Sequence, residues 1–312
     1  MNTICTISTI KAPLGETLMF VNYHLNIGID QIIVFFDDPD DVAADCLKDY
    51  PAVTCVRCDD SYWKQYGGLR PAAIEDRQVV NNNNGLEMAR SRGIQWAIFI
   101  DHDELVYPVG DLKNILSALR TDVIRFTIHE AISEEEHYDN IYVPTLFKKP
   151  AGPLQIRAAM LLGCRRAFFE GGYFRAHLDS KVAVRVNAEV RMMGIHGPSS
   201  AGDSVVEKTT TQVKLLHYDC VGIDSWKSKW LGRMNVSAVK GLRGRRKTQL
   251  DLFASAIRND GEDLRRLYRQ VYLIPKYEQA ILRGLNMLTV VQIDGKYFEP
   301  PPQQGTKLGC QR

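Results

Sequence analysis

The sequence predicts an α/β protein, with helices flanking a mostly parallel central sheet and a helical extension at the C-terminal end. Strand, helix and strand patterns alternate within the first 60 residues, as is typical of parallel nucleotide-binding sheets. Beyond residue 222 the apolar residues recur at helical spacing instead. We therefore expect a catalytic-type α/β domain over residues 1–222, a basic helical extension over 223–298 and a disordered tail over 299–312.

The first half of the chain carries the clearest strand and helix patterns. Residues 3–9 alternate with β-branched side chains, which favours a strand. Leu18, Val21 and Leu25 recur at helical spacing, and Gly28 is a suitable helix terminator. We expect strands at 3–9, 31–36, 53–58, 96–100 and 123–127, and helices at 14–27, 71–92 and 110–119.

The second half is patterned less regularly. We expect a mobile acidic loop over 130–139 and an irregular basic stretch over 142–166. Strands at 190–195 and 213–216 would place His196 and His217 at their tips, and a third strand is expected at 181–186. One or two amphipathic helices are expected within 250–288.

The most informative motif is the strand Trp96–Ile100 followed at once by Asp101, Asp103 and Glu104. Ligands in open α/β sheets lie beyond the carboxyl ends of the strands. Carboxylates crowded there repel one another unless a cation is bound. Hard oxygen ligands suit Mg²⁺ or Mn²⁺, which would bridge to phosphates. The alternative interpretation is a solvated acidic turn.

Four consecutive asparagines lie within the helix expected at 71–92. If this stretch is helical, Arg77, Asn81, Asn84 and Met88 share one face. The run could be a loop or a solvated face. Alternatively, it could place amides and a guanidinium near the base and ribose of a nucleotide.

Composition limits the other classes of function. The 312 residues can bury a substantial core. No apolar run approaches the roughly 18 residues of a membrane span, and we expect no signal peptide. Seven scattered cysteines favour reduced thiols and a cytoplasmic location. Cys55 and Cys58 lack the second pair that a zinc site needs, so we interpret them as two thiols on a strand.

Charge is distributed unevenly along the chain. Residues 1–220 hold 22 basic and 29 acidic side chains, whereas 221–312 hold 17 and 8. A basic C-terminal third can mark an anionic partner or simply a solvated helical face. Its positive charge, together with Trp226 and Trp230, suggests peripheral contact with an anionic membrane, at the inner face for a cytoplasmic protein.

Several blocks of sequence resemble the GT-A glycosyltransferases of the family 2 type. The most similar subgroup is the family 92-like set, formerly a domain of unknown function. The resemblance covers roughly residues 3–235, and the chain departs from it at the asparagine run and at Asp37-Asp38-Pro39. The matching blocks are Ile7 to Lys11, Tyr23-His24-Leu25 with Gly28, residues 32–38, the helix containing Gln78, Trp96 to Glu104, Lys181, Ile195-His196 and His217-Tyr218.

This resemblance implies an enzyme that transfers a sugar, most simply from a UDP-sugar. The acceptor would be a glycan, a polysaccharide or a lipid-linked molecule, and the reaction would invert the anomeric carbon. Mn²⁺ or Mg²⁺ would bind Asp101, Asp103 and His196. Donor contacts are expected from Ser8, Lys11, Asp37, Asp38, Arg77, Asn81, Asp101 and His217, with Lys181 offsetting phosphate charge.

Inversion needs a general base near the acceptor hydroxyl. Glu104, Glu170 and Asp179 are the candidates, and we favour Asp179.

Two other functions compete with this interpretation. A sugar-phosphate nucleotidyltransferase should carry an N-terminal glycine-rich loop, but residues 8–18 contain only Gly15. A polyanion- or nucleic-acid-binding protein could act through the basic run at 240–247. That run lacks the interleaved aromatics of such sites, and we expect no nucleic-acid partner.

Overall fold

The computed structural model describes residues 2–66, 68–170, 172–176, 179–234, 244–259 and 261–302. These residues form two compact units that interleave along the chain. The first comprises Met1–Thr127, Asp179–Leu215 and Asp294–Arg312, and the second comprises Ile128–Leu178 and Leu216–Ile293. The predicted division at residues 222 and 298 stays a prediction.

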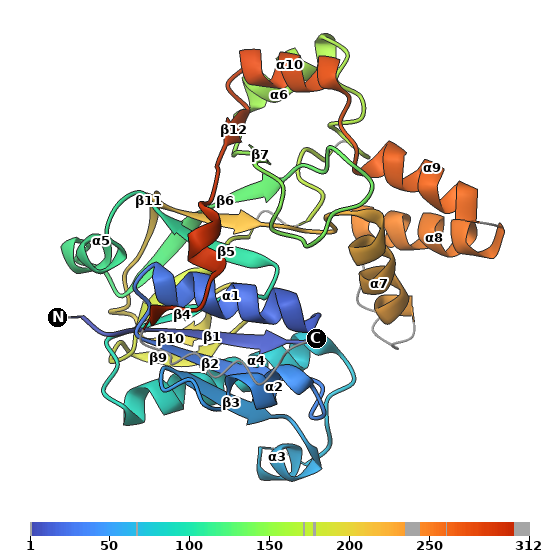
Figure 1. Ribbon diagram of the computed structural model, residues 1–312. Helices are drawn as coiled ribbons and strands as arrows, with labels where there is room; N and C mark the ends of the chain where they lie inside the picture. The colour runs from blue at the N-terminus through green and yellow to red at the C-terminus, as the bar shows by residue number, and fades with distance from the viewer. Residues whose placement is uncertain are drawn as a thin grey trace. The chain divides into compact units, whose positions relative to one another are not determined.

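The first unit is built on a sheet with a parallel centre, which confirms the predicted α/β class (Figure 1). Ile7 of the central strand pairs with Ile33 on one side and with Phe99 on the other, both in parallel register. Two antiparallel strands extend the sheet beyond this centre. The order is β3 (Val53–Arg57), β2 (Gln31–Phe36), β1 (Ile4–Ile10), β4 (Trp96–Phe99), β8 (Val182–Arg185) and β6 (Val123–Ala131).

The sequence patterns did not predict some strands of the structure and predicted others too short. β5 (Glu104–Pro108) begins at the last acid of the Asp-x-Asp-Glu motif and pairs with β11 (Glu207–His217). The predicted strand at 213–216 is therefore only the end of β11. β9 (Val190–Met193) pairs with β10 (Pro198–Ala201), so His196 lies in the turn of a hairpin rather than at a strand tip.

The helices of this unit include α4 (Ile74–Ser91), and the asparagine run is helical throughout. Asp41, Asp59 and Asp111 cap the N-termini of three helices with their side chains. Two of these acids follow strands β2 and β3, so part of the acidity at the strand ends is helix capping. The remaining elements are α1 (Leu14–Asn26), α2 (Val42–Leu47), α3 (Asp60–Gln65), α5 (Leu112–Ala118) and the 3₁₀ helix η2 (Gly295–Phe298).

The second unit contains two apolar clusters. One packs Ala159 of α6 (Pro153–Leu161) against Leu282 of α10 (Lys276–Gly284). The other surrounds Trp226 and Trp230, both fully buried. These tryptophans therefore cannot contact a membrane, which corrects that part of the sequence interpretation. The other elements are β7 (Leu146–Lys148), β12 (Leu288–Val290), α7 (Ile223–Met234), α8 (Gly244–Asn259) and α9 (Gly261–Val271).

Several expectations for the second half need correction. The segment expected to be irregular at 142–166 contains β7 and α6. Glu130, assigned to a mobile loop, lies in β6, is fully buried, and binds Lys148 at 2.9 Å. The last four residues of the basic run, 244–247, begin α8, while 240–243 lie outside the described residues. The predicted tail is described only to residue 302.

Cysteine chemistry and hydropathy complete the description. Cys5, Cys55, Cys58, Cys164 and Cys220 carry free thiols, as expected. Cys46 takes part in a disulfide, contrary to the expectation of reduced thiols. Among the residues described, no helix has both the length and the apolar character needed to cross a bilayer.

The contact of α4 with β1 gives the first testable prediction. A Cβ atom at Gly85 would lie 2.5 Å from Cγ2 of the buried Ile7. We expect Gly85→Ala to lower the free energy of unfolding by about 1–3 kcal/mol through overpacking, despite its better helix propensity. Gly232→Ala in α7, where a Cβ meets nothing within 4 Å, should instead add up to about 1 kcal/mol. Urea unfolding of both variants measures this, and equal shifts would contradict it.

Candidate active site

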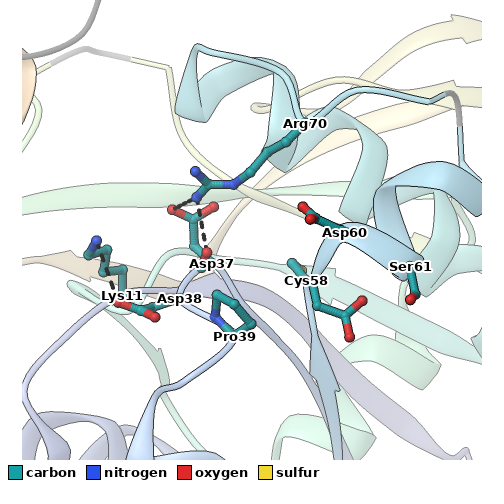
Figure 2. Close-up of a pocket in the computed structure, with 9 residues that line it drawn as sticks. Lys11, Asp37, Asp38, Pro39, Cys58, Asp60, Ser61 and Arg70 are labelled. Carbon is teal, nitrogen blue, oxygen red and sulfur yellow. Dashed lines mark hydrogen bonds and ion pairs between the residues drawn. The ribbon is translucent and has the colours of Figure 1, made fainter.

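The carboxyl ends of β1, β2 and β3 surround a cavity of about 490 Å³ in the first unit (Figure 2). Each of these parallel strands delivers polar residues to it as the strand ends. Its position agrees with the rule that ligands bind beyond the carboxyl ends of parallel strands. The lining residues are Lys11, Asp37, Asp38, Pro39, Cys58, Asp59, Asp60, Ser61 and Arg70.

Asp37 is the buried anion of this cavity, and two arginines bind it. Arg77 makes a bidentate contact, with Nε 2.6 Å and Nη2 3.0 Å from the carboxylate oxygens. Arg70 also lies 3.0 Å from the carboxylate and is half-exposed. Figure 2 shows its guanidinium group facing Asp37. Lys11 lies 3.8 Å from Asp38 at the solvated rim. The cavity therefore offers both signs of charge, with cationic groups available at its edge.

Helix α4 connects this cavity to the acidic turn. Arg77 holds Asp37 beyond β2, and the next residue, Gln78, donates a 2.7 Å hydrogen bond to Asp101 beyond β4. One turn further along, the amide of Asn81 donates to Thr9 of β1 at 2.9 Å. Three strand ends are thus fixed by one helix face. The face that contains Arg77 and Asn81 is largely buried, so the solvated alternative for it is wrong.

Lys181 neutralises the acidic turn. Its Nζ lies 2.8 Å from Asp101 and 4.0 Å from Glu104, and its side chain is 3% exposed. The same ammonium donates to the Ile195 carbonyl at 3.2 Å. Glu104 accepts the Asp101 backbone N–H at 2.9 Å through Oε2. Among the described residues, its other carboxylate oxygen has no hydrogen-bond partner.

The protonation of this cluster follows from burial. Burial raises the pKa of Glu104 well above its ordinary value of 4.5, and Lys181 only partly offsets this. Asp101 and Asp103 raise it further by repulsion. Burial alone would lower the pKa of Lys181, but Asp101 and then Glu104 outweigh it and raise that pKa. We therefore expect Lys181 to stay charged and Glu104 to hold its proton to a higher pH than a solvated glutamate.

The other predicted site residues of the first unit are placed as follows. Ser8 is buried in β1, and its Oγ has no hydrogen-bond partner among the residues described. Asp179 is exposed just before β8, and Asp103 is buried. Within the first unit, the described residues gather no three His, Cys, Asp or Glu ligand atoms within 4.8 Å of one another. The metal set of Asp101, Asp103 and His196 therefore stays a prediction.

Two of the predicted residues belong to the second unit. Glu170 is exposed and has a positive φ of 48°. His217 ends β11, two residues before the fully buried Asp219, which binds Lys229 at 2.7 Å and Arg246 at 3.0 Å. Burial alone would raise the pKa of Asp219, but Arg246 and then Lys229 hold it well below its usual value.

Sequence reasoning missed Arg70 and Asp219. Each is an isolated charge in an irregular segment, where no periodicity or spacing marks a partner.

Two plant proteins are similar in sequence to this chain, although no protein-family model matches it. Glycosyltransferase-like At2g41451 of Arabidopsis thaliana is 25% identical over 243 residues, which cover 69% of this chain and 53% of that protein. Glycosyltransferase-like At3g57200 of Arabidopsis thaliana is 25% identical over 246 residues, which cover 69% of this chain and 46% of that protein. This chain thus spans about half the length of these curated relatives.

Among solved structures, weaker likenesses occur. HddC from Yersinia pseudotuberculosis aligns over 70% of this chain and 93% of its own, at 11% identity and a TM-score of 0.35. S. aureus TarS 1-349 aligns over 91% of this chain and 86% of its own, at 11% identity and a TM-score of 0.37. A second TarS structure, in complex with UDP-GlcNAc, has a TM-score of 0.35.

The raised pKa of Glu104 predicts a pH dependence of stability. The folded protein holds this proton more tightly than the unfolded chain, so its contribution is lost as the pH rises from about 4.5 through the folded-state pKa. Glu104→Gln removes the titration, so its stability relative to wild type should increase as the pH rises above about 4.5. The gain is at most about 1.4 kcal/mol per pH unit.

Urea unfolding across this pH range measures the difference. Glu189→Gln is the matched control, because Glu189 is exposed and should follow the wild-type curve. Parallel stability curves for wild type and Glu104→Gln would contradict the assignment.

Proposed function

We propose that this protein is a glycosyltransferase that uses a nucleotide-diphosphate sugar, with UDP-sugar as the first choice of donor. The observation that carries the proposal is geometric. The cavity at β1, β2 and β3 and the acidic turn after β4 lie at the same carboxyl edge of one parallel sheet. The glycosyltransferase-like names of the two plant relatives support this choice of chemistry.

In this proposal the cavity holds the nucleoside. Asp37 and Asp38 can accept hydrogen bonds from a base and from ribose hydroxyls, because carboxylates are acceptors only. Asp37 is held rigidly by Arg77, whereas Asp38 is half-exposed and available at the rim. Lys11 and Arg70 supply positive charge on the side where a phosphate would leave the cavity. We propose Ser8 and Asn81, both buried, as further contacts to the nucleoside.

The acidic turn would receive the diphosphate and sugar. Asp101 is oriented by Lys181 and Gln78, so it can present its carboxylate to a ribose or sugar hydroxyl. The carboxylates of the turn are hard oxygen donors of the kind that Mn²⁺ and Mg²⁺ prefer. We propose Asp103 as the principal ligand, with Asp101 and His196 as further ligands and His217 as a diphosphate contact. The ion would supply charge stabilisation for the departing nucleoside diphosphate.

The acceptor side follows from exposure. Glu104 is fully buried, so an acceptor hydroxyl cannot reach it from solvent, and burial raises its pKa. Asp179 is exposed and lies two residues before Lys181. We propose Asp179 as the general base of an inverting transfer to a glycan, polysaccharide or lipid-linked acceptor, with Glu170 as the alternative. Lys181 acts by holding the Asp101 carboxylate in position through their 2.8 Å contact.

Calorimetric titration of UDP, with and without Mn²⁺, tests the proposal. Wild type should bind UDP more tightly with Mn²⁺, and Asp103→Ala should lose that metal-dependent gain. Asp38→Ala should weaken UDP binding about tenfold or more in either condition, because a charged hydrogen bond is removed. Asp203→Ala is the control, since Asp203 is exposed in the same unit and lies outside the cavity.

The outcomes separate the parts of the proposal. If Asp103→Ala and Asp203→Ala lose Mn²⁺-dependent binding equally, Asp103 is not the principal metal ligand. Failure of wild type to bind UDP, GDP, CDP or dTDP would refute nucleotide-sugar transfer altogether.

A further inference from the structure

The outer face of α6 in the second unit is apolar and exposed. Leu154 is 79% exposed, Met160 53% and Leu161 89%, and Leu162 at the end of the helix is 59% exposed. Leu154 and Leu161, seven positions apart, lie on one face of α6 with Met160 beside them, and Leu162 directly follows the helix. Isolated exposed leucines are ordinary. Four large apolar side chains on or directly after one short helix instead form a patch of the kind that marks an interaction site.

The helix is held firmly enough to present this patch. On its inner side Ala159 and Ile156 pack into the cluster that includes Leu282. Gln155 accepts the Gly152 backbone N–H at 2.9 Å and donates to the Leu285 carbonyl at 2.8 Å. Both ends of the side chain amide are therefore satisfied within the second unit. The exposed leucines are the outer half of a packed helix rather than part of a frayed segment.

Three exposed arginines lie on α6 or directly after it, and no acidic residue lies between Pro153 and Arg166. They are Arg157, Arg165 and Arg166. Arg157 lies on the exposed face of α6 itself, and Arg165 and Arg166 are exposed directly after it. Buried Glu278 accepts the backbone N–H groups of Arg166 and Ala167, which fixes the loop that carries these two arginines.

We propose that α6 and the loop after it dock this protein on an anionic lipid surface. Leu154, Met160, Leu161 and Leu162 would enter the boundary between headgroups and acyl chains. Arg157, Arg165 and Arg166 would bind the lipid phosphates. An apolar face bordered by arginines is the arrangement that interfacial helices use. The inference concerns a surface remote in sequence from the cavity residues and does not depend on the identity of the donor.

Charge distinguishes a lipid surface from a second copy of the chain. Two copies meeting through this face would bring Arg157, Arg165 and Arg166 of each close to their counterparts, and the described residues of the patch offer no acid to compensate. Like charges brought together at an interface are unfavourable. An anionic bilayer supplies the missing negative charge, and each arginine near its surface strengthens the binding.

Vesicle sedimentation tests the proposal with the full chain. Wild type should bind vesicles of phosphatidylglycerol mixed with phosphatidylcholine at low salt, and bind pure phosphatidylcholine much less. Leu161→Gln should lower the partition coefficient about tenfold, because one leucine is no longer buried. Arg157→Gln should lower it about fivefold and weaken the salt dependence.

Matched control variants distinguish binding through this face from nonspecific binding of the protein to vesicles. Leu69→Gln removes an equally exposed leucine from the first unit, at 93% exposure, and Arg265→Gln removes an exposed arginine from α9. Both should bind as wild type does. Absence of wild-type binding at low salt, or equal effects of Leu161→Gln and Leu69→Gln, would overturn the proposal. A concentration-dependent dimer that Leu161→Gln abolishes, without vesicle binding, would assign the face to a second copy instead.

Discussion

The first unit depends on one buried cation. Lys181 lies between Asp101 and Glu104, and it offsets negative charge in the turn where three acids follow the apolar strand β4. Breaking a buried ion pair by removing one partner costs about 3–5 kcal/mol. The same cation orients Asp101, and its charge offsets part of the rise in the pKa of Glu104 that burial causes. Stability and the geometry of the candidate site therefore rest on the same ammonium group.

The acids at the strand ends differ in what they do. Asp41 and Asp59 cap helices, Asp37 is buried in a bidentate pair with Arg77, and Asp38 remains at the solvated rim of the cavity. Only the acids without such a structural task can change partners when a ligand binds. A glycosyltransferase site at this edge would thus use few of the carboxylates that crowd it, and the others would keep the strand ends in register.

For some residues the sequence pattern predicted the helix correctly, but tertiary packing gave its face a different environment. Trp226 and Trp230 do recur on a helix face, but that face is buried in the second unit against Phe253 and Tyr268. Conversely, α6 lies in a stretch where the pattern was judged irregular, because its apolar residues occupy both faces. Periodicity identifies a helix by the contrast between its faces, so a helix with an exposed apolar face is easily missed.

The sequence alone determined the parallel strands and the acidic turn, because buried β-branched runs and their abrupt polar ends are local features. Predicted strands and observed strands agree within two residues for β1 to β4. It also marked Arg77, Asn81 and Lys181 as candidates, but not their partners. Only the tertiary structure decided that Arg77 binds Asp37, that Gln78 binds Asp101 and that Lys181 lies between two acids. These pairs join residues 23 to 80 positions apart, and no local preference encodes which charges meet across such distances in the chain.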